Sequence, residues 1–413
     1  MKTNCIKGGL AVNVGDMIAH RKALICKGLG ILAAAAGMAS CAKVEQNSVP
    51  ADLTWQVIED SPSTKASAYD TDDTFLSWAW YLPEGKTWSK EKDKAAAQRY
   101  IGGESSGATI GYVTSKTAWK NVIKNGSSWD EGVTYYWPKA GTLTFFAASP
   151  SSLGSAVSCT TDGIKITDWD VDKHQDVDIM VADLAADQST NTTSTGGWLT
   201  GVPTIFRHKL TKVEGFAFNL QKDYSNGHDG STGKEYVSGD IRYFVKSIKI
   251  KNIPQSGSYA NSSPTSGNLG VWTPQGTSTG TYTWYTYSGS EPGLEIKKQA
   301  ADTPVPATSL VPATRDYIYL LPQLFSNPGE NPDWSTTPCI EIEYVKWTYT
   351  SASTYSEEII PARGSLYDVL GSSHRLVINR RLNFRITFNN ESNTIIWAPD
   401  QEDWGSGEFE IYV

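Results

Sequence analysis

The sequence predicts an all-β protein with two β-sandwich domains. Short segments alternate apolar and polar residues with a period of two, and many of their apolar residues are β-branched or aromatic. Gly, Ser, Thr and Asn are concentrated between these segments, as is typical of turns that join short strands. The helical signal is weak, because only residues 90–100 and 117–124 could form a few helical turns. Many short strands separated by turns favour packed β-sheets.

Five segments carry the clearest strand pattern. In chain order they are residues 53–57 (LTWQV), 142–146 (TLTFF), 245–250 (VKSIKI), 340–345 (IEIEYV) and 382–388 (LNFRITF). Polar stretches rich in Gly, Ser or Pro lie between them, and we expect loops there. The stretches are residues 187–197, 224–239, 256–280 and 300–312.

The length of the chain predicts two domains, each large enough for its own core. We place the boundary near residue 200, where the polar stretch at residues 187–197 ends. Residues 53–199 would then form the N-terminal sandwich, and residues 200–413 the C-terminal one. No repeat of fixed period is visible, which argues against solenoids and propellers.

Residues 1–40 are typical of an export signal. Basic residues precede a short apolar run at residues 28–37 (GLGILAAAAG), and small residues follow it. The run is too short to cross a bilayer, which takes about 20 apolar residues. The segment before the run is long for such a signal, so Met17 is an alternative start of translation.

The motif that ends this segment predicts a lipid anchor. Met-Ala-Ser-Cys at residues 38–41 resembles the bacterial lipobox, in which small residues precede an invariant cysteine. The resemblance implies cleavage between Ser40 and Cys41, with the lipid on Cys41 and residues 41–52 as a tether. The alternative is an ordinary signal peptide with a chance cysteine.

Charge and cysteine content limit the classes of partner and fold. The formal net charge is −8, and removal of the basic leader would make the rest more acidic. This balance argues against nucleic acid as a partner. Besides Cys41, only Cys159 and Cys339 would remain, so the fold is no disulfide scaffold. One disulfide and two buried thiols are both compatible with the sequence.

Motifs of enzymes are not found in the sequence. It has no Gly-x-Ser-x-Gly elbow, no His-Glu-x-x-His, no P-loop and no dinucleotide-binding glycine fingerprint. The acidic run at residues 168–178 lacks the glycine and final glutamate of an EF-hand, which favours a solvated loop over a calcium site. His208 alternates with apolar neighbours and is expected to be a packed strand residue. We therefore expect a non-enzymatic protein with no cofactor or metal.

Several segments, taken in order, carry a family resemblance. They are residues 129–150 (WDEGVTYYWPKAGTLTFFAASP), 178–182 (DIMVA), 202–213 (VPTIFRHKLTKV) and the Arg/Asn-rich strand at residues 379–388. Behind a lipobox, this succession resembles the fimbrillin-like lipoproteins of Bacteroidales, which are related to the pilins of type V pili. The polar inserts leave open whether the chain is a stalk, tip or accessory subunit.

The resemblance implies two transthyretin-like β-sandwich domains and attachment to the outer membrane through a lipid anchor. It also implies adhesion and partnership with other pilin subunits. In polymerising members, a protease cuts after a basic residue in an early loop, the first strand is released, and a strand of the next subunit fills the groove. Lys65 fits the cleavage position, and Phe409, Ile411 and Val413 fit the donor strand. The alternative is that both chain ends are ordinary strands and Lys65 is a solvated lysine.

Tryptophan clusters indicate a second possible function. Trp78, Trp80, Trp272 and Trp284 lie in aromatic-rich segments, and aromatic rings on a sandwich face can stack on sugars. These residues would make the chain a surface glycan-binding lipoprotein that does not polymerise, with host or bacterial glycans or proteins as partners. The alternative is that the rings fill the two cores.

Overall fold

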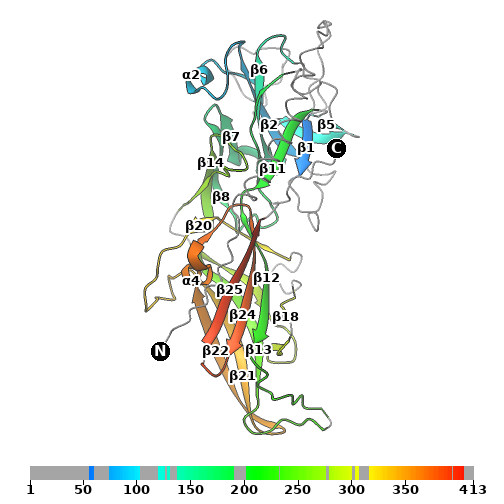
Figure 1. Cartoon of the computed structure of the whole chain (residues 1–413), viewed down its shortest axis with the longest axis vertical. Coiled ribbons are helices and arrows are strands. Elements are labelled where there is room, and N and C mark those ends of the chain that lie inside the picture. The colour runs from blue at the N-terminus through cyan, green and yellow to red at the C-terminus, as the bar shows by residue number, and fades with distance from the viewer. Residues whose placement is uncertain are drawn as a thin grey trace, which may run out of the picture. The chain divides into compact units, whose positions relative to one another are not determined.

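The structure is a computed structural model (Figure 1). It describes most of the chain between residues 55 and 403, with gaps. The described residues are 55–59, 74–102, 120–125, 128–130, 137–189, 201–231, 233–275, 279–299, 303–306, 316–392 and 394–403. No helix in these residues is long and apolar enough to cross a membrane.

Two sheets build the first sandwich. The nine-stranded sheet contains β1 (Trp55–Glu59), β2 (Phe75–Leu82), β3 (Gln98–Ile101), β4 (Lys120–Asn125), β5 (Ser128–Asp130), β6 (Thr142–Ser149), β9 (Met180–Ala182), β10 (Ala185–Gln188) and β11 (Val202–His208). The four-stranded sheet contains β7 (Val157–Thr160), β8 (Gly163–Asp170), β14 (Ser256–Asn261) and β15 (Val271–Pro274). Buried residues of both sheets, among them Trp78, Phe146, Ile166 and Tyr259, form one core. We call it the inter-sheet core.

The nine-stranded sheet closes on itself. Its pairings run β6–β9–β11–β1–β5–β4–β2 and return from β2 to β6. The face of β2, β6 and β11 that is turned away from the inter-sheet core buries a separate cluster, which includes Phe75, Phe145 and Phe206. We call it the ring core. A closed path of strands leaves fewer unpaired backbone edges than an open sheet does.

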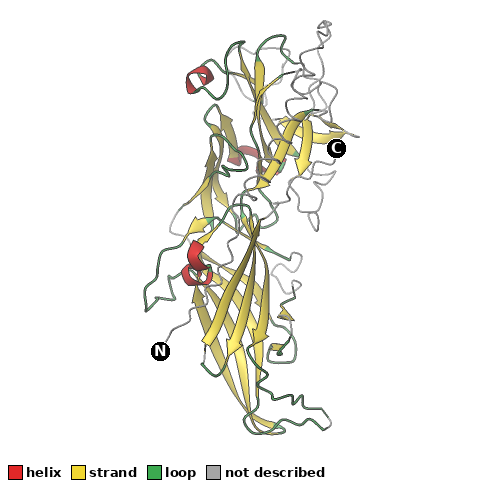
Figure 2. Cartoon of the chain, in the orientation of Figure 1, coloured by secondary structure: helices red, strands yellow, loops and turns green. Residues whose placement is uncertain are grey.

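Two further sheets build the second sandwich, and strands dominate it (Figure 2). The β12 sheet contains β12 (Thr211–Leu220), β18 (Thr303–Pro304), β19 (Ile318–Leu320), β24 (Arg380–Asn389) and β25 (Thr394–Asp403). The β13 sheet contains β13 (Ile241–Pro254), β16 (Thr279–Thr286), β17 (Leu294–Ile296), β21 (Cys339–Ser351) and β22 (Thr354–Ser365). β20 (Gln323–Leu324) pairs with β23 (Arg375–Leu376).

The core of the second sandwich follows from the alternation in its strands. Every second residue of β12 is buried on either side of a register shift at Gly215, and Phe216 stacks on Phe384 with ring centroids 5.0 Å apart. A Cβ at Gly215 would lie 2.7 Å from the Asn383 side-chain oxygen, so a larger residue here would require the Asn383 side chain to move. Residues of the facing β13 sheet, Trp284 among them, complete the core. Apolar faces that meet in this way define a β-sandwich.

The all-β prediction is confirmed, and each of the five predicted strand segments lies in or overlaps a strand. Helices are short: α2 (Glu91–Lys94), α4 (Leu366–Val369), η1 (Ser151–Ala156) and η3 (Gly371–Ser373). Two local predictions were wrong. The helix expected at residues 117–124 is replaced by β4, and the loop expected at residues 256–280 contains β14 and β15. Tyr259 and Trp272 bury their rings in the inter-sheet core, which stabilises this hairpin despite its polar composition.

Candidate functional site

The first strand of the described chain lies inside the closed sheet. β1 runs parallel to β11, with five residues in register from the pair Trp55–Val202 to the pair Glu59–Phe206. Its other edge meets β5 at the single pair Trp55–Trp129. Figure 1 shows β1 directly beside β11. β1 is thus the strand that closes the path between β11 and β5, and it is attached mainly to β11.

The ring core includes residues of β11. Val202 and Phe206 are buried there, and the Phe206 ring meets Phe75 edge-on with centroids 5.2 Å apart. Removing β1 would therefore leave the β11 backbone unpaired along one edge, next to an apolar cluster. An extended segment can satisfy both needs, because its backbone restores the ladder while alternate side chains enter the cluster.

Charged residues occupy the end of β11. Arg207 forms a bidentate ion pair with Asp183, with Nε–Oδ1 and Nη2–Oδ2 distances of 2.8 Å each. His208 Nδ1 lies 2.8 Å from Asp178 Oδ2, so this histidine is a strand residue with a carboxylate partner. Lys209 is only 1% exposed, and its backbone oxygen accepts a hydrogen bond from Trp272 Nε1 at 2.6 Å. Burial lowers the pKa of Lys209 to about 7, with the Asp183 charge opposing the shift and Arg207 adding to it.

Most of the predicted site residues lie outside the described part of the chain. These are Ser40 and Cys41 at the expected processing point, Lys65 at the expected cleavage point, and Phe409, Ile411 and Val413 in the expected donor strand. The domain boundary near residue 200 also stays a prediction. Pairing of β14 with β8 joins segments from the two sides of that position.

The four tryptophans predicted to stack on glycans are buried. Trp78, Trp80 and Trp272 lie in the inter-sheet core, and Trp284 lies in the core of the second sandwich. Arg99 also covers the Trp80 ring, with its guanidinium carbon 4.3 Å from the ring centroid. A ring must present a face to solvent in order to stack on a sugar. The prediction is therefore wrong for these four residues, which fill cores.

Both remaining cysteines of the described chain are free. Cys159 and Cys339 are buried thiols, which decides between the two possibilities that the sequence left open. Burial raises the pKa of Cys159 to about 12 and raises that of Cys339 as well. Thiols with raised pKa values are poor nucleophiles at neutral pH.

The acidic run at residues 168–178 forms the end of β8 and a turn. Asp170 pairs with Lys173 at 2.8 Å, and the buried Gln175 side chain exchanges hydrogen bonds with the backbone of Tyr319 at 2.7 and 2.8 Å. In the residues that the structure describes, no group of three or more His, Cys, Asp or Glu is arranged to hold a metal ion.

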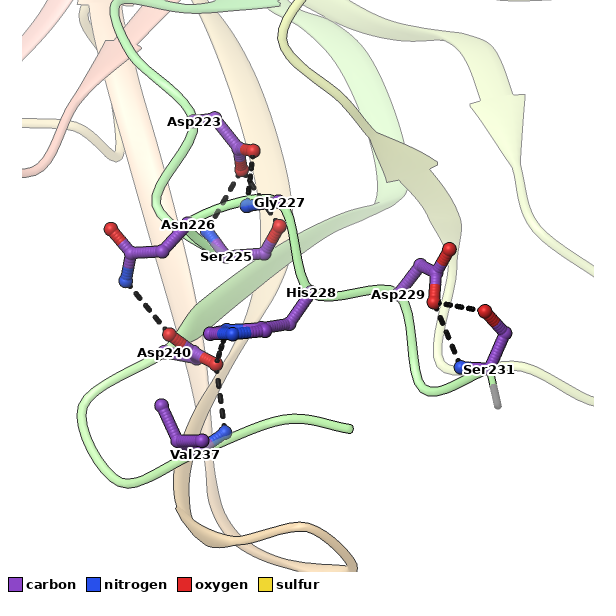
Figure 3. A network of polar contacts seen from close by, with 9 residues as sticks. All are labelled: Asp223, Ser225, Asn226, Gly227, His228, Asp229, Ser231, Val237 and Asp240. Carbon is purple, nitrogen blue, oxygen red and sulfur yellow. Dashed lines mark hydrogen bonds and ion pairs between the residues drawn. The ribbon is translucent and has the colours of Figure 1, made fainter. Parts of the chain in front are cut away.

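A polar network that the sequence did not predict folds the loop before β13 (Figure 3). The Asp240 carboxylate is fully buried and accepts hydrogen bonds from Asn226 Nδ2 at 2.7 Å, Val237 N at 2.8 Å and His228 Nδ1 at 2.6 Å. Burial opposes ionisation, but these bonds outweigh it, so the pKa of Asp240 lies below its usual value. Asp223 accepts bonds from the Ser225 and Gly227 amides in the same loop.

This network fixes one segment of the loop against the β13 sheet. The Tyr349 amide in β21 donates to the Asp240 carbonyl, and the Gly239 amide donates to the Tyr349 carbonyl, each at 2.9 Å. Tyr236, four residues before Asp240, stacks on Tyr349 with ring centroids 4.1 Å apart. The repeated Asp-x-Ser at residues 223–225 and 229–231 is a sequence signal of such turns.

The two β-sandwiches make this chain an all-β protein. Comparison with known families assigns the chain to one of them. The model of the fimbrillin-like family matches residues 86–404. The chain therefore belongs to the fimbrillin-like family, and the resemblance found in its sequence is confirmed. No curated protein matches the chain.

Several solved structures are similar to this chain. A fimbrial protein from Bacteroides vulgatus has a TM-score of 0.54 and 14% identity, over 86% of this chain and 99% of that one. A putative cell adhesion protein from Bacteroides uniformis has a TM-score of 0.39 and 14% identity, over 86% and 99%. The tip fimbrial protein Mfa3 from Porphyromonas gingivalis, truncated at its C-terminus, has a TM-score of 0.31 and 12% identity, over 86% and 100%. At 14% identity, the Bacteroides vulgatus structure supports the fold alone.

Proposed function

We propose that the chain is a lipid-anchored subunit of a surface fibre, which assembles by strand exchange and mediates adhesion. The single observation that carries this proposal is the position of β1, a short N-terminal strand inserted between β11 and β5 beside the ring core. Membership of the fimbrillin-like family supports it. The protein acts by binding and has no catalytic role.

Strand exchange gives the two chain ends complementary roles. Cleavage after Lys65 would detach β1, and the C-terminal strand of a second copy would take its place. Phe409, Ile411 and Val413 alternate over five residues, which is also the length over which β1 pairs with β11. Burying each of these side chains contributes roughly 1.5–3 kcal/mol, and the backbone ladder fixes the register.

The anchor and the partners follow from the same proposal. The lipid on Cys41 holds the precursor at the outer membrane until cleavage after Lys65 releases the subunit for assembly. Other pilin subunits are then the principal partners, and the position in the fibre is that of a stalk, tip or accessory subunit. The acidic charge of the chain keeps it from binding nucleic acid.

Deletion of residues 408–413 tests the donor strand. We expect the truncated chain to fold with an unchanged melting temperature but to form no oligomers after treatment with a trypsin-like protease. Thermal melting and native electrophoresis measure the two outcomes. Lys65→Ala should also block oligomers in the full chain, whereas Lys65→Arg, which keeps a basic cleavage residue, should allow them. A truncation that melts several degrees early, with no protease-dependent oligomers of the full chain, would rule out donation.

Cys41→Ala tests the anchor. The variant should incorporate no labelled palmitate, because the Cys41 thiol is the proposed point of acylation, and its precursor should be left uncut or be released from membranes. Metabolic labelling and membrane fractionation measure these effects. Cys26→Ala, which changes a cysteine within the leader, should keep the label. Palmitate retained on Cys41→Ala would contradict the proposal.

A further inference from the structure

The outer face of the β13 sheet carries its own aromatic cluster. Phe244, Val345, Trp347 and Tyr349 are buried there together with Tyr236 of the preceding loop, apart from the core of the second sandwich. Tyr243 and Val245, the two neighbours of Phe244 in β13, lie in that core instead. We call this outer cluster and the neighbouring part of β22 the aromatic platform.

One ring of the platform faces solvent. Tyr355 in β22 is 41% exposed, and its ring stacks on Trp347 with centroids 3.9 Å apart and an interplanar angle of 21°. The Tyr349 ring lies 5.5 Å away at a steeper angle. Trp347 therefore covers one face of the Tyr355 ring and holds its plane. A flat ring held in this way is preorganised for a flat apolar ligand face.

Polar groups surround the exposed ring. The Trp347 indole donates to Glu357 Oε2 at 2.9 Å, which leaves the other carboxylate oxygen of this exposed side chain able to accept a hydrogen bond. Arg242 is held by Glu295 Oε1 at 2.8 Å and by the Tyr349 hydroxyl at 3.2 Å. Its own charge is thus paired locally, and Glu357 offers a carboxylate acceptor on the rim.

The loop before β13 borders the platform. Tyr236 stacks on Tyr349, and its neighbour Val237 is 48% exposed. The bond from the Val237 amide to the buried Asp240 carboxylate fixes this position. The network of Figure 3 therefore positions the loop side of the platform.

The size of the surface argues against a protein partner. Tyr355 and Ile359, which share this face of β22, are 41% and 52% exposed, and together they present on the order of 200 Å² of apolar surface. A stable protein interface buries about 800 Å² on each partner. The strand edge is also blunted against pairing with another chain, because β22 contains Pro361 and two glutamates.

We propose that the aromatic platform binds neutral glycans, with a pyranose ring stacked on Tyr355 and its hydroxyls bonded to Glu357. The apolar C–H face of a pyranose matches the exposed ring in shape and polarity. The negative charge of Glu357 disfavours anionic polymers, and its free carboxylate oxygen can accept a hydrogen bond from a sugar hydroxyl. This inference rests on the proposed adhesive function and specifies the class of ligand that such adhesion would use.

The test measures binding of the full chain, purified in detergent, to an array of neutral gluco-, manno-, galacto- and xylo-oligosaccharides. Each ligand found on the array is then titrated in solution. We expect Tyr355→Ala to weaken binding by roughly tenfold, whereas Tyr355→Phe keeps the ring and should keep most of the affinity. Leu324→Ala removes a more exposed apolar side chain from β20 and should change nothing.

The controls separate this inference from the proposed assembly. Thermal melts of the variants should match the unchanged chain, and protease-dependent oligomers should form with Tyr355→Ala as they do without it. Absence of binding to every neutral oligosaccharide, or equal affinity of Tyr355→Ala, would overturn the glycan platform. Loss of oligomers in Tyr355→Ala would identify the platform as a contact between subunits and overturn it as well. Glycan binding by a chain that never forms oligomers would support the platform and contradict the fibre.

Discussion

Trp284→Ala is expected to lower the free energy of unfolding by about 3–5 kcal/mol. The Trp284 side chain is completely buried in the core of the second sandwich and lies 5.3 Å, centroid to centroid, from Phe216. Truncation would remove its transfer free energy and leave a cavity between the β12 and β13 sheets. Urea unfolding monitored by circular dichroism measures the loss.

Two variants isolate the cause of that effect. The Trp284 indole nitrogen is buried without a hydrogen-bond partner among the described residues, so Trp284→Phe removes a polar cost while keeping most of the packing. We expect it to cost less than about 1.5 kcal/mol. Trp334→Ala, in the loop before β21 and outside the core, should change stability by no more than about 0.5 kcal/mol. Equal losses for Trp284→Ala and Trp334→Ala would contradict the assignment of Trp284 to the core.

Strands were predictable because their signal is local. Residues 382–388 alternate strictly, and a period of two requires no knowledge of the rest of the chain. The hairpin of β14 and β15 was missed because glycine and serine dominate its composition. Its pairing with β8 and the burial of Tyr259 and Trp272 stabilise it. Such pairing is non-local and is not visible in a window of ten residues.

The inner face of a strand was less predictable than the strand itself. Trp284 and Trp347 both lie in alternating aromatic runs, yet the first is in a sandwich core and the second supports the aromatic platform. Alternation separates the two faces of a strand without indicating which face meets another sheet. The aromatic segments that the sequence indicated for glycan stacking therefore fill cores, and the aromatic platform lies in other strands.

Prediction of the candidate site would have required even more information on long-range contacts. The parallel register of β1 and β11 joins residues 55–59 to residues 202–206, and no local pattern indicates it. Asp240 is one of many acids in the sequence, and its role follows only from its burial and three hydrogen-bond donors. Motif order nevertheless identified the family, because a succession of weak motifs constrains the whole chain.

Between about pH 7 and pH 10, stability is expected to rise with pH because of Lys209. Burial lowers the pKa of this side chain from 10.5 to about 7. In that window the unfolded chain holds the proton and the folded chain has lost it, so unfolding takes up a proton and becomes less favourable as pH rises. Below about pH 7 both states are protonated, and the full cost of burying the charge is present.

Lys209→Met should remove this dependence and stabilise the protein at neutral pH. Asp183 cannot neutralise the Lys209 amine fully, since it already forms the bidentate pair with Arg207. Replacing a buried charge by an apolar side chain of similar length should therefore raise the free energy of unfolding at pH 7 by about 1–4 kcal/mol. The difference between Lys209→Met and the unchanged chain should shrink toward pH 10, because the stability of the unchanged chain rises with pH through Lys209 whereas that of the variant does not. Lys212→Met is the matched control. This lysine is partly exposed and paired with Glu214 at 2.8 Å. Its loss should therefore cost no more than about 1 kcal/mol and leave the pH dependence intact.

Urea unfolding of the three chains at pH 6.5, 8 and 9.5 measures the free energy of unfolding and its pH dependence. Parallel curves for Lys209→Met and the unchanged chain would show that the buried amine does not titrate in this window.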